Sequence, residues 1–166
     1  RLQQLTELWF NDNALTGPIP AAVGRLQKIQ DLRLSENLLT GAIPPEIFSM
    51  TNAQRILLNS NQLGGQLPDL PSPQMESLVI LRLSRNQLTG PIPGYFGQMS
   101  SLRQIWLHIN QFSGPVPLAE VCGSFIAGQR LDFIQADCAP LDDPPNPCRC
   151  CSACCDRTTE VCLTSQ

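Results

Sequence analysis

The stretch Asn86-Gln-Leu-Thr-Gly-Pro-Ile-Pro93 decides the fold, because close copies of it recur along the chain at a fixed spacing. The copies, this one included, begin at Asn13, Asn37, Asn61, Asn86 and Asn110. Successive copies are 24, 24, 25 and 24 residues apart. A fixed period of this length predicts a stacked solenoid, in which each repeat buries its apolar edge only against its neighbours.

Each repeat begins with alternating apolar and polar residues, as in Leu32-Arg-Leu34. Alternation with a period of two is typical of a β-strand, whose successive side chains point to opposite faces. Stacking of the repeats then predicts a parallel sheet with strands about 4.8 Å apart. We expect the leucines to face the shared core and the residue between them to face outward.

The Asn that heads each copy is interpreted as structural. A side-chain amide can donate and accept, so a buried Asn at this bend can bond backbone groups that the turn leaves without partners. The column consists of Asn13, Asn37, Asn61, Asn86 and Asn110. Loss of one member is expected to destabilise the fold by about 1 to 3 kcal/mol.

The rest of each repeat predicts a second run of extended segments and a short turn. Gly permits unusual backbone angles and Pro fixes φ, so the Gly-x-Ile-Pro stretch is extended and ends sharply. Segments such as 45–50 have the apolar spacing of one short helical or 3₁₀ turn on the convex side. The third repeat departs from this pattern, because Pro68-Asp-Leu-Pro71-Ser-Pro73 predicts an extended loop on the back.

The cysteines are confined to the last quarter of the chain, outside the repeats. They are Cys122, Cys138, Cys148, Cys150, Cys151, Cys154, Cys155 and Cys162. An even number so closely spaced predicts a disulfide framework formed in an oxidising compartment, either outside the cell or in an organelle lumen. Cys pairs two residues apart also suit tetrahedral zinc, but adjacent Cys pairs fit disulfides better, so we predict no metal site. The connectivity stays open.

Composition disfavours several functions. A net charge of -3 and a single lysine, Lys28, give no basic cluster for nucleic acid. The sequence contains no run of about twenty apolar residues, so it predicts no membrane-spanning segment. We find no catalytic Ser-His-Asp set, paired cleft carboxylates or phosphate-binding glycine loop, and so expect neither an enzyme nor a cofactor. Because the chain begins at Arg1 without a leader, we expect that a leader was cleaved or that an N-terminal part is missing.

The repeat pattern Leu-x-x-Leu-x-Leu-x-x-Asn-x-Leu-x-Gly-x-Ile-Pro covers roughly residues 2–118. It resembles the plant-type extracellular leucine-rich repeats of receptor-kinase ectodomains and polygalacturonase-inhibiting proteins. The tail around Cys148-Arg-Cys-Cys-Ser-Ala-Cys-Cys155 resembles those of secreted leucine-rich-repeat proteins of microalgae such as diatoms. The resemblance implies a right-handed superhelix with a concave parallel β-sheet, five repeats over residues 1–118 and a disulfide-rich C-terminal cap over 119–166. It implies recognition of another molecule and not a reaction.

The outward strand residues give a candidate binding column on the concave face. In chain order they are Trp9, Arg33, Leu57, Arg82 and Trp106. With strands about 4.8 Å apart, the two indoles lie roughly 19 Å from each other. Trp and Arg dominate the energetics of many interfaces, which favours a binding role. The alternative is that these side chains merely stack on one another as cation-π pairs.

Neighbouring positions predict a charge gradient and an apolar patch. Acidic residues decorate the first two strands and basic ones the later strands: Glu7, Asp12, Asp31 and Glu36, then Arg55, Arg82, Arg85 and Arg103. Such a face would orient a polar partner, although ordinary solvated charge and cross-strand pairing explain it equally well. Val79, Ile80 and Ile109 are expected to be exposed beside Trp106. His108 is expected there too, as a surface imidazole without a catalytic role.

Three functions remain open. The first is a non-enzymatic extracellular module that binds a protein, peptide or polysaccharide, with its docking region in the C-terminal half of the concave sheet. The second is a structural subunit of a cell-surface or luminal assembly, suggested by the N-terminal edge, where Leu2, Leu5 and Leu8 begin a strand without a preceding cap. The third, implied only by the resemblance, is inhibition of a wall-degrading glycosidase.

Overall fold

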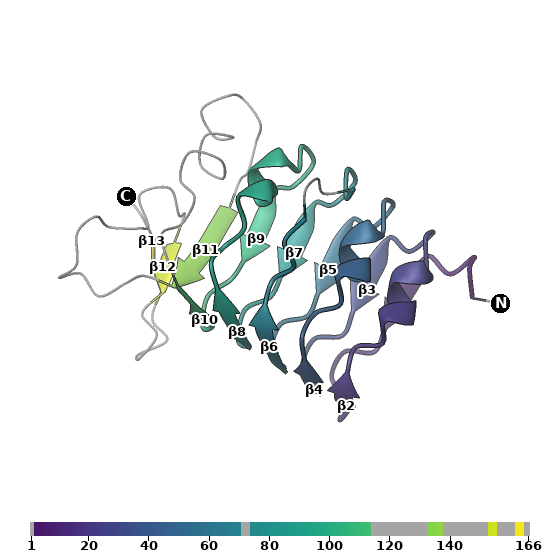
Figure 1. Ribbon diagram of the computed structural model, residues 1–166, viewed down its shortest axis with the longest axis horizontal. Coiled ribbons are helices and arrows are strands. Elements are labelled where there is room, and N and C mark those ends of the chain that lie inside the picture. Colours follow the sequence, from purple (N-terminus) through teal and green to yellow (C-terminus); the bar gives the residue numbers. More distant parts are fainter. Residues whose placement is uncertain (1, 71–73, 114–132, 138–152, 156–161, 165–166) are drawn as a thin grey trace.

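A computed structural model describes residues 2–70 and 74–113, and the strand backbone of residues 133–137, 153–155 and 162–164. The repeats stack side by side along the long axis of the molecule, with the first repeat at one end and the strand of residues 133–137 beyond the last repeat at the other (Figure 1). The predicted solenoid is therefore confirmed. The prolines at 71 and 73 of the predicted loop lie outside the described residues.

The larger sheet is formed by the strand that opens each repeat. Its first five members are β1 (Glu7–Trp9), β3 (Asp31–Arg33), β5 (Arg55–Leu57), β7 (Ile80–Arg82) and β9 (Gln104–Trp106). They are parallel, and the central residue of each strand pairs with the central residue of the next. Constant register places equivalent side chains of all five repeats in straight columns, as the sequence predicted.

This sheet continues beyond the last repeat. β11 (Phe133–Asp137) pairs with β9 in parallel, β12 (Ala153–Cys155) pairs with β11, and β13 (Cys162–Thr164) closes the sheet in antiparallel. The backbone of the C-terminal segment therefore supplies hydrogen-bonding partners to β9, which would otherwise be an unpaired edge. The predicted disulfides cannot be placed, because five cysteines lie outside the described residues and only the backbone of Cys154, Cys155 and Cys162 is described.

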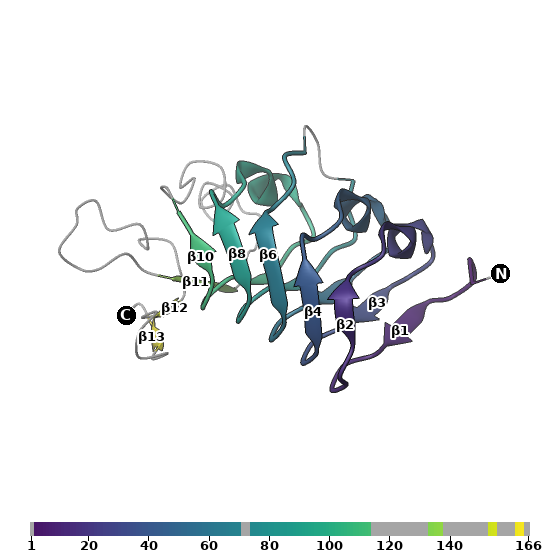
Figure 2. The ribbon, with the colours of Figure 1, turned by 60° about the horizontal axis from the view of Figure 1, so that its bottom comes forward.

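The extended Gly-Pro segments form a second parallel sheet, as predicted. Its strands are β2 (Thr16–Pro18), β4 (Leu38–Gly41), β6 (Gln62–Gln66), β8 (Gln87–Gly90) and β10 (Gln111–Phe112). They run side by side across the front of the view in Figure 2. Glycine is needed here because the backbone of Gly90 and its equivalents has a positive φ, near +75°.

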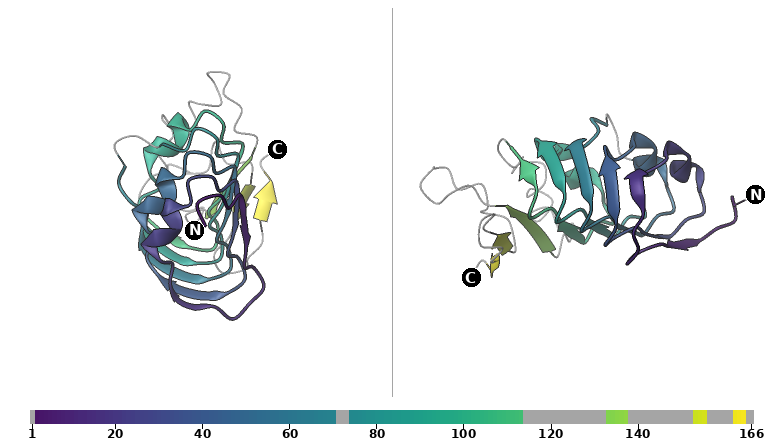
Figure 3. Two further views of the ribbon diagram at one scale, coloured as in Figure 1. Left: turned by 90° about the vertical axis from the view of Figure 1, so that its right-hand side faces the viewer. Right: turned by 90° about the horizontal axis from the view of Figure 1, so that it is seen from below.

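The convex side carries three 3₁₀ helices, η1 (Ala21–Arg25), η2 (Pro45–Ser49) and η3 (Gly94–Gln98). Figure 3 shows them on the side of the solenoid opposite the larger sheet. Each begins after an extended proline, because Pro sets φ near the helical value but leaves the preceding chain extended. No such helix occurs among the described residues between β6 and β7, where the proline-rich loop was predicted.

The core runs the length of the solenoid between these three surfaces. Leu32, Ile56, Leu81 and Ile105, the central residues of four strands, are each at most 1% exposed. No helix in the described part of the chain is long and apolar enough to cross a membrane. Within the same residues, no group of three or more His, Cys, Asp or Glu side chains is arranged to hold a metal ion.

Candidate functional site: the outer face of the larger sheet

The asparagine column links each repeat to the one before it. Asn37 Oδ1 accepts a hydrogen bond from Leu15 N at 3.0 Å, and its Nδ2 donates to Phe10 O at 2.8 Å and Leu34 O at 3.1 Å. Asn61, Asn86 and Asn110 make the equivalent bonds. Asn13 differs, because it is exposed and its amide bonds only carbonyls of its own repeat.

The residue before each Asn adopts a left-handed backbone conformation, which was not predicted from the sequence. These residues are Asp12, Glu36, Ser60, Arg85 and Ile109, with φ of 56° or 57°. A non-glycine residue in this region is strained by about 1 to 2 kcal/mol. The strain is tolerated because cross-repeat backbone bonds, such as Glu36 N to Asn59 O at 3.0 Å, hold the bend on both sides.

Register brings the predicted Trp-Arg residues into one column, which we call the concave face column: Trp9, Arg33, Leu57, Arg82 and Trp106. Its two ends are built alike. The Arg33 guanidinium carbon lies 4.4 Å from the centre of the Trp9 ring, and that of Arg82 lies 4.2 Å from the centre of the Trp106 ring. Trp9 is 53% exposed, and the other four side chains are half-buried. Cation-π stacking thus accompanies an accessible surface, so the two interpretations drawn from the sequence are not exclusive.

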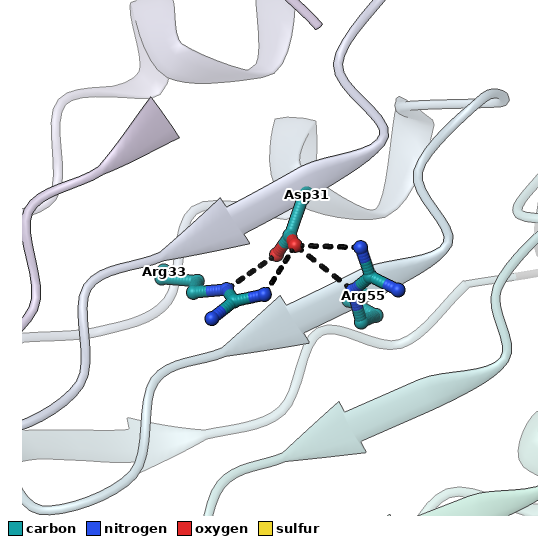
Figure 4. Close-up of polar contacts among 3 residues, drawn as sticks. All are labelled: Asp31, Arg33 and Arg55. Atoms are coloured by element: carbon teal, nitrogen blue, oxygen red, sulfur yellow. Dashed lines mark hydrogen bonds and ion pairs between the residues drawn. The ribbon is translucent and has the colours of Figure 1, made fainter. Parts of the chain in front are cut away.

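Asp31 occupies the N-terminal half of this face (Figure 4). Arg33 donates to it through Nε at 3.0 Å and Nη2 at 2.7 Å, and Arg55 donates through Nε at 2.9 Å and pairs through Nη2 at 2.8 Å. Burial by itself raises the pKa of this carboxyl, but the hydrogen bonds and charges of Arg33 and Arg55 together hold its pKa below the ordinary value. Asp31 is only 1% exposed, so the prediction that it is one of the solvent-facing acids is wrong.

The C-terminal half of the face has a different residue at the corresponding position. The strand register pairs Asp31 with Arg55 and Arg55 with Ile80, so Ile80 occupies the position equivalent to Asp31. Ile80 stands two residues before Arg82, just as Asp31 stands two residues before Arg33. The side chain of Arg82 makes no ion pair or hydrogen bond with the described residues, and its Nε is buried without an acceptor. The two Trp-Arg pairs therefore share geometry but differ in charge.

Two further expectations for this half are wrong. His108 is only 7% exposed and stands beside the Trp106 ring, with their centres 6.1 Å apart. It is buried because it occupies the position where the chain turns inward toward the asparagine bend, and Ser35 and Ser84 at the equivalent positions are buried as well. Val79, Ile80 and Ile109 are half-buried rather than exposed. The exposed large apolar side chains of the described residues lie at the N-terminal end instead: Leu2, Trp9, Phe10, Leu15 and Leu38.

The remaining predicted charges are spread around the face. Arg85 is exposed, and Arg103 Nη1 donates to Ser100 O at 3.0 Å and Leu102 O at 3.2 Å, which ties that side chain to the backbone. Glu7, Asp12 and Glu36 are exposed. A hydrogen bond with Asp12, together with its charge, raises the pKa of Glu36. Of the four acids predicted for this face, the three accessible ones are therefore at the N-terminal end, as predicted, and Asp31 is not among them.

Comparison with known proteins agrees with this geometry. A family model described as Leucine Rich Repeat matches residues 4–26, 28–50 and 77–99. These three stretches match leucine-rich repeats, and the chain as a whole resembles plant proteins built from such repeats. No curated protein matches the chain by sequence. The leucine-rich repeats nevertheless superpose well on solved structures.

Two of these structures are plant receptor ectodomains. The ectodomain of the Arabidopsis receptor kinase HAESA, in complex with an N-terminally extended IDA peptide hormone, is 29% identical with a TM-score of 0.71, over 81% of this chain and 22% of that chain. The ectodomain of GASSHO1/SCHENGEN3 from Arabidopsis thaliana, in complex with CASPARIAN STRIP INTEGRITY FACTOR 2, is 32% identical with a TM-score of 0.69, over 82% and 16%. The chain therefore spans only a small part of the length of these ectodomains.

A third structure is a plant ice-binding protein, 29% identical with a TM-score of 0.64, over 81% of this chain and 41% of that chain. The leucine-rich-repeat scaffold of the chain is thus similar both to ectodomains solved with ligands and to a protein named for binding ice. Leucine-rich-repeat scaffolds are typically binding domains, and which surface binds depends on the side chains that each one presents.

Proposed function

We propose that the chain is an extracellular, non-enzymatic binding module that recognises a peptide or protein on its concave face. The observation that carries this proposal is the single column from Trp9 to Trp106, held in register by five strands. Trp and Arg are over-represented at binding hot spots, and a rigid sheet presents them without a large ordering cost. Similar ectodomains from Arabidopsis were solved with a peptide hormone and with an integrity factor, which supports this class of ligand.

The cation-π pairs favour a peptide or protein over a polysaccharide. A sugar ring stacks on an open indole face, but one face of Trp9 is covered by Arg33 and one face of Trp106 by Arg82. The column therefore presents guanidinium groups beside the indoles, together with the aliphatic surface of Leu57. Such a mixture suits the alternating apolar and polar groups of a polypeptide.

The test uses the centre of the column. The chain is immobilised, partners from its native source are captured and identified by mass spectrometry, and affinity is then measured for two variants. Leu57→Lys places a charge in the middle of the concave face, whereas Gln62→Lys places the same charge on an exposed position of the second sheet. We expect Leu57→Lys to weaken binding about tenfold or more, and Gln62→Lys to bind like the unmodified chain. Equal affinity of both variants would contradict the proposal.

A second candidate function, ice binding, is favoured by the outer face of the second sheet. Its outward residues carry no charge and are exposed or half-buried: Thr16, Pro18, Leu38, Thr40, Gln62, Gly64, Gln66, Gln87, Thr89 and Gln111. The strand pairing sets hydroxyl beside amide, with Thr40 opposite Gln62 and Thr89 opposite Gln111. A neutral, regularly spaced surface suits a neutral lattice of water, and one similar structure is a plant ice-binding protein.

The same two variants separate this candidate from the first. If the chain binds ice, Gln62→Lys should reduce inhibition of ice recrystallisation because it brings a hydrated charge onto the uncharged face. Leu57→Lys, on the other sheet, should leave that inhibition unchanged. Absence of any effect of the unmodified chain on recrystallisation removes ice binding.

Two proposals from the sequence keep tests of their own. A structural subunit would self-associate or require an assembly partner, so an isolated chain that sediments as a folded monomer argues against that role. A glycosidase inhibitor would slow pectin-degrading enzymes in a direct assay, and unchanged rates would exclude that function.

A further inference from the structure

We infer that the partner presents a carboxylate, from an acidic side chain of a peptide or protein, to Arg82 in the C-terminal half of the concave face. This inference rests on the function proposed above and specifies its ligand. It derives from a comparison of two halves of the same sheet, which have the same Trp-Arg pair but a different residue beside it.

The N-terminal half already contains its own carboxylate. Asp31 receives Nε and Nη2 of Arg33 at 3.0 and 2.7 Å, a bidentate arrangement in which the planar guanidinium and carboxylate match. Arg55 adds a second pair from the next strand. Asp31 thus engages both guanidinium groups, and together with the nearby charge of Glu7 it balances the two positive charges of this half, so little attraction remains for an external anion.

Among the described residues, the C-terminal half has the guanidinium without a carboxylate at the equivalent position. Ile80 stands where Asp31 would stand, and its side chain offers no acceptor. The Arg82 guanidinium carbon lies 4.2 Å from the centre of the Trp106 ring, and the side chain makes neither a hydrogen bond nor an ion pair with the described residues. Among its nitrogens only Nε is buried, so the terminal nitrogens are within reach of a group that approaches from solvent.

A partly desolvated guanidinium without an acceptor is less stable than a paired one, and a carboxylate is the planar acceptor that it matches best. Stacking on Trp106 holds the guanidinium in place, which reduces the ordering cost on binding. At the opposite end, Glu7, Asp12 and Glu36 are exposed and repel an anion. The acidic group of the ligand is therefore directed to Arg82, and this sets the orientation of the ligand along the column.

The experiment transfers the internal carboxylate from one half to the other. A random peptide library displayed on phage is selected on the unmodified chain, and the selected peptides are synthesised with each Asp or Glu intact or replaced by Asn or Gln. Binding is measured to the unmodified chain, to Ile80→Asp, which supplies Arg82 with a carboxylate of its own, and to Ile80→Asn, which is matched in size but neutral. Thermal unfolding of each variant confirms that it is folded.

We expect the selected peptides to be rich in acidic residues and to lose affinity about tenfold when the key carboxylate becomes an amide. Ile80→Asp should lower affinity to the same degree, about tenfold, and only for peptides with that carboxylate. Ile80→Asn should retain most of the affinity. Acidic peptides that bind Ile80→Asp as tightly as the unmodified chain, or selected peptides without acidic residues, overturn the inference.

Binding to the Leu57→Lys variant distinguishes failure of this inference from failure of the proposed function. If Leu57→Lys weakens peptide binding while Ile80→Asp does not, the ligand lies on the concave face but makes no carboxylate contact with Arg82. If Leu57→Lys also leaves binding unchanged, or if the chain retains no peptide at all, the concave face is not a peptide site and both statements are wrong.

Discussion

At the scale of single residues, one asparagine in each of four repeats joins that repeat to the one before it, because its amide oxygen accepts from a backbone N–H of the preceding repeat. The repeated Asn, the core leucines and the Trp-Arg column follow directly from period and alternation. The left-handed position holds five different residue types, from Asp12 to Ile109, so composition gives no signal there. Asp31 and His108 were predicted to be exposed because strand alternation indicates only which way a side chain points. Asp31 is buried by its ion pairs and His108 by the inward turn of the chain, and alternation reports neither.

The asparagine ladder gives a prediction about stability. Asn86→Ala should leave Leu63 N and the carbonyls of Leu58 and Leu83 without their buried partner, and should lower the free energy of unfolding by about 1 to 3 kcal/mol. Asn13→Ala is the matched control, because Asn13 is exposed and should change stability by less than about 0.5 kcal/mol. Denaturant unfolding measures both. Equal effects would mean that cross-repeat bonding by the amide does not stabilise the stack.

The Asp31 ion pairs predict a dependence of stability on pH. The pKa of Asp31 is lower in the folded chain than its ordinary value of 3.8, so the ionised carboxylate stabilises the fold above that pH. This contribution is lost as the pH falls through the folded-state pKa. The difference in unfolding free energy between the unmodified chain and Asp31→Asn should therefore be constant above about pH 5 and should shrink toward about pH 2. A difference that stays constant over this range would contradict the ion-pair account.

At the scale of secondary structure, the strands and the 3₁₀ turns were predictable because each has its own apolar spacing and its own Gly or Pro boundary. The close packing between turns was not. An added Cβ at Gly24 of η1 would lie 2.3 Å from the backbone oxygen of Glu46 in the next repeat, so η1 and η2 approach as closely as glycine allows. The sequence does not predict this contact, because Gly24 and Gly97 stand at the equivalent position of η1 and η3 but Phe48 occupies it in η2, so the pattern is not consistent.

Glycine substitutions test this packing. Gly24→Ala should force η1 and η2 apart and lower the free energy of unfolding by about 1 to 3 kcal/mol. Gly64→Ala serves as control, since its Cβ would meet Gln87 O at an ordinary 3.6 Å and its φ is not positive; it should change stability by less than about 0.5 kcal/mol. Thermal and denaturant unfolding of both variants give the comparison. Similar stabilities would show that the turns can separate without loss.

At the scale of the whole molecule, stacking in register creates two outer faces with different chemistry on one scaffold. The larger sheet presents arginines, indoles and carboxylates, while the second sheet presents only uncharged side chains. The sequence predicted the first face because alternation in the strands marks its outward residues. The way in which the sheet continues through β11 was not predictable, because that segment lacks the repeat and pairs with β9 through its backbone. Stability should be shared between neighbouring repeats, with each repeat depending on the next.

Oxidative footprinting of the captured complex, read by mass spectrometry, tests the central claim most directly. Trp9 on the concave face and Leu38 on the second sheet are exposed to similar degrees, 53% and 46%, so each reports on its own sheet in one sample. We predict that bound partner slows oxidation of Trp9 and Leu57 and leaves Leu38 unchanged. Protection of Leu38 together with unaltered oxidation of Trp9 and Leu57 would contradict recognition on the concave face.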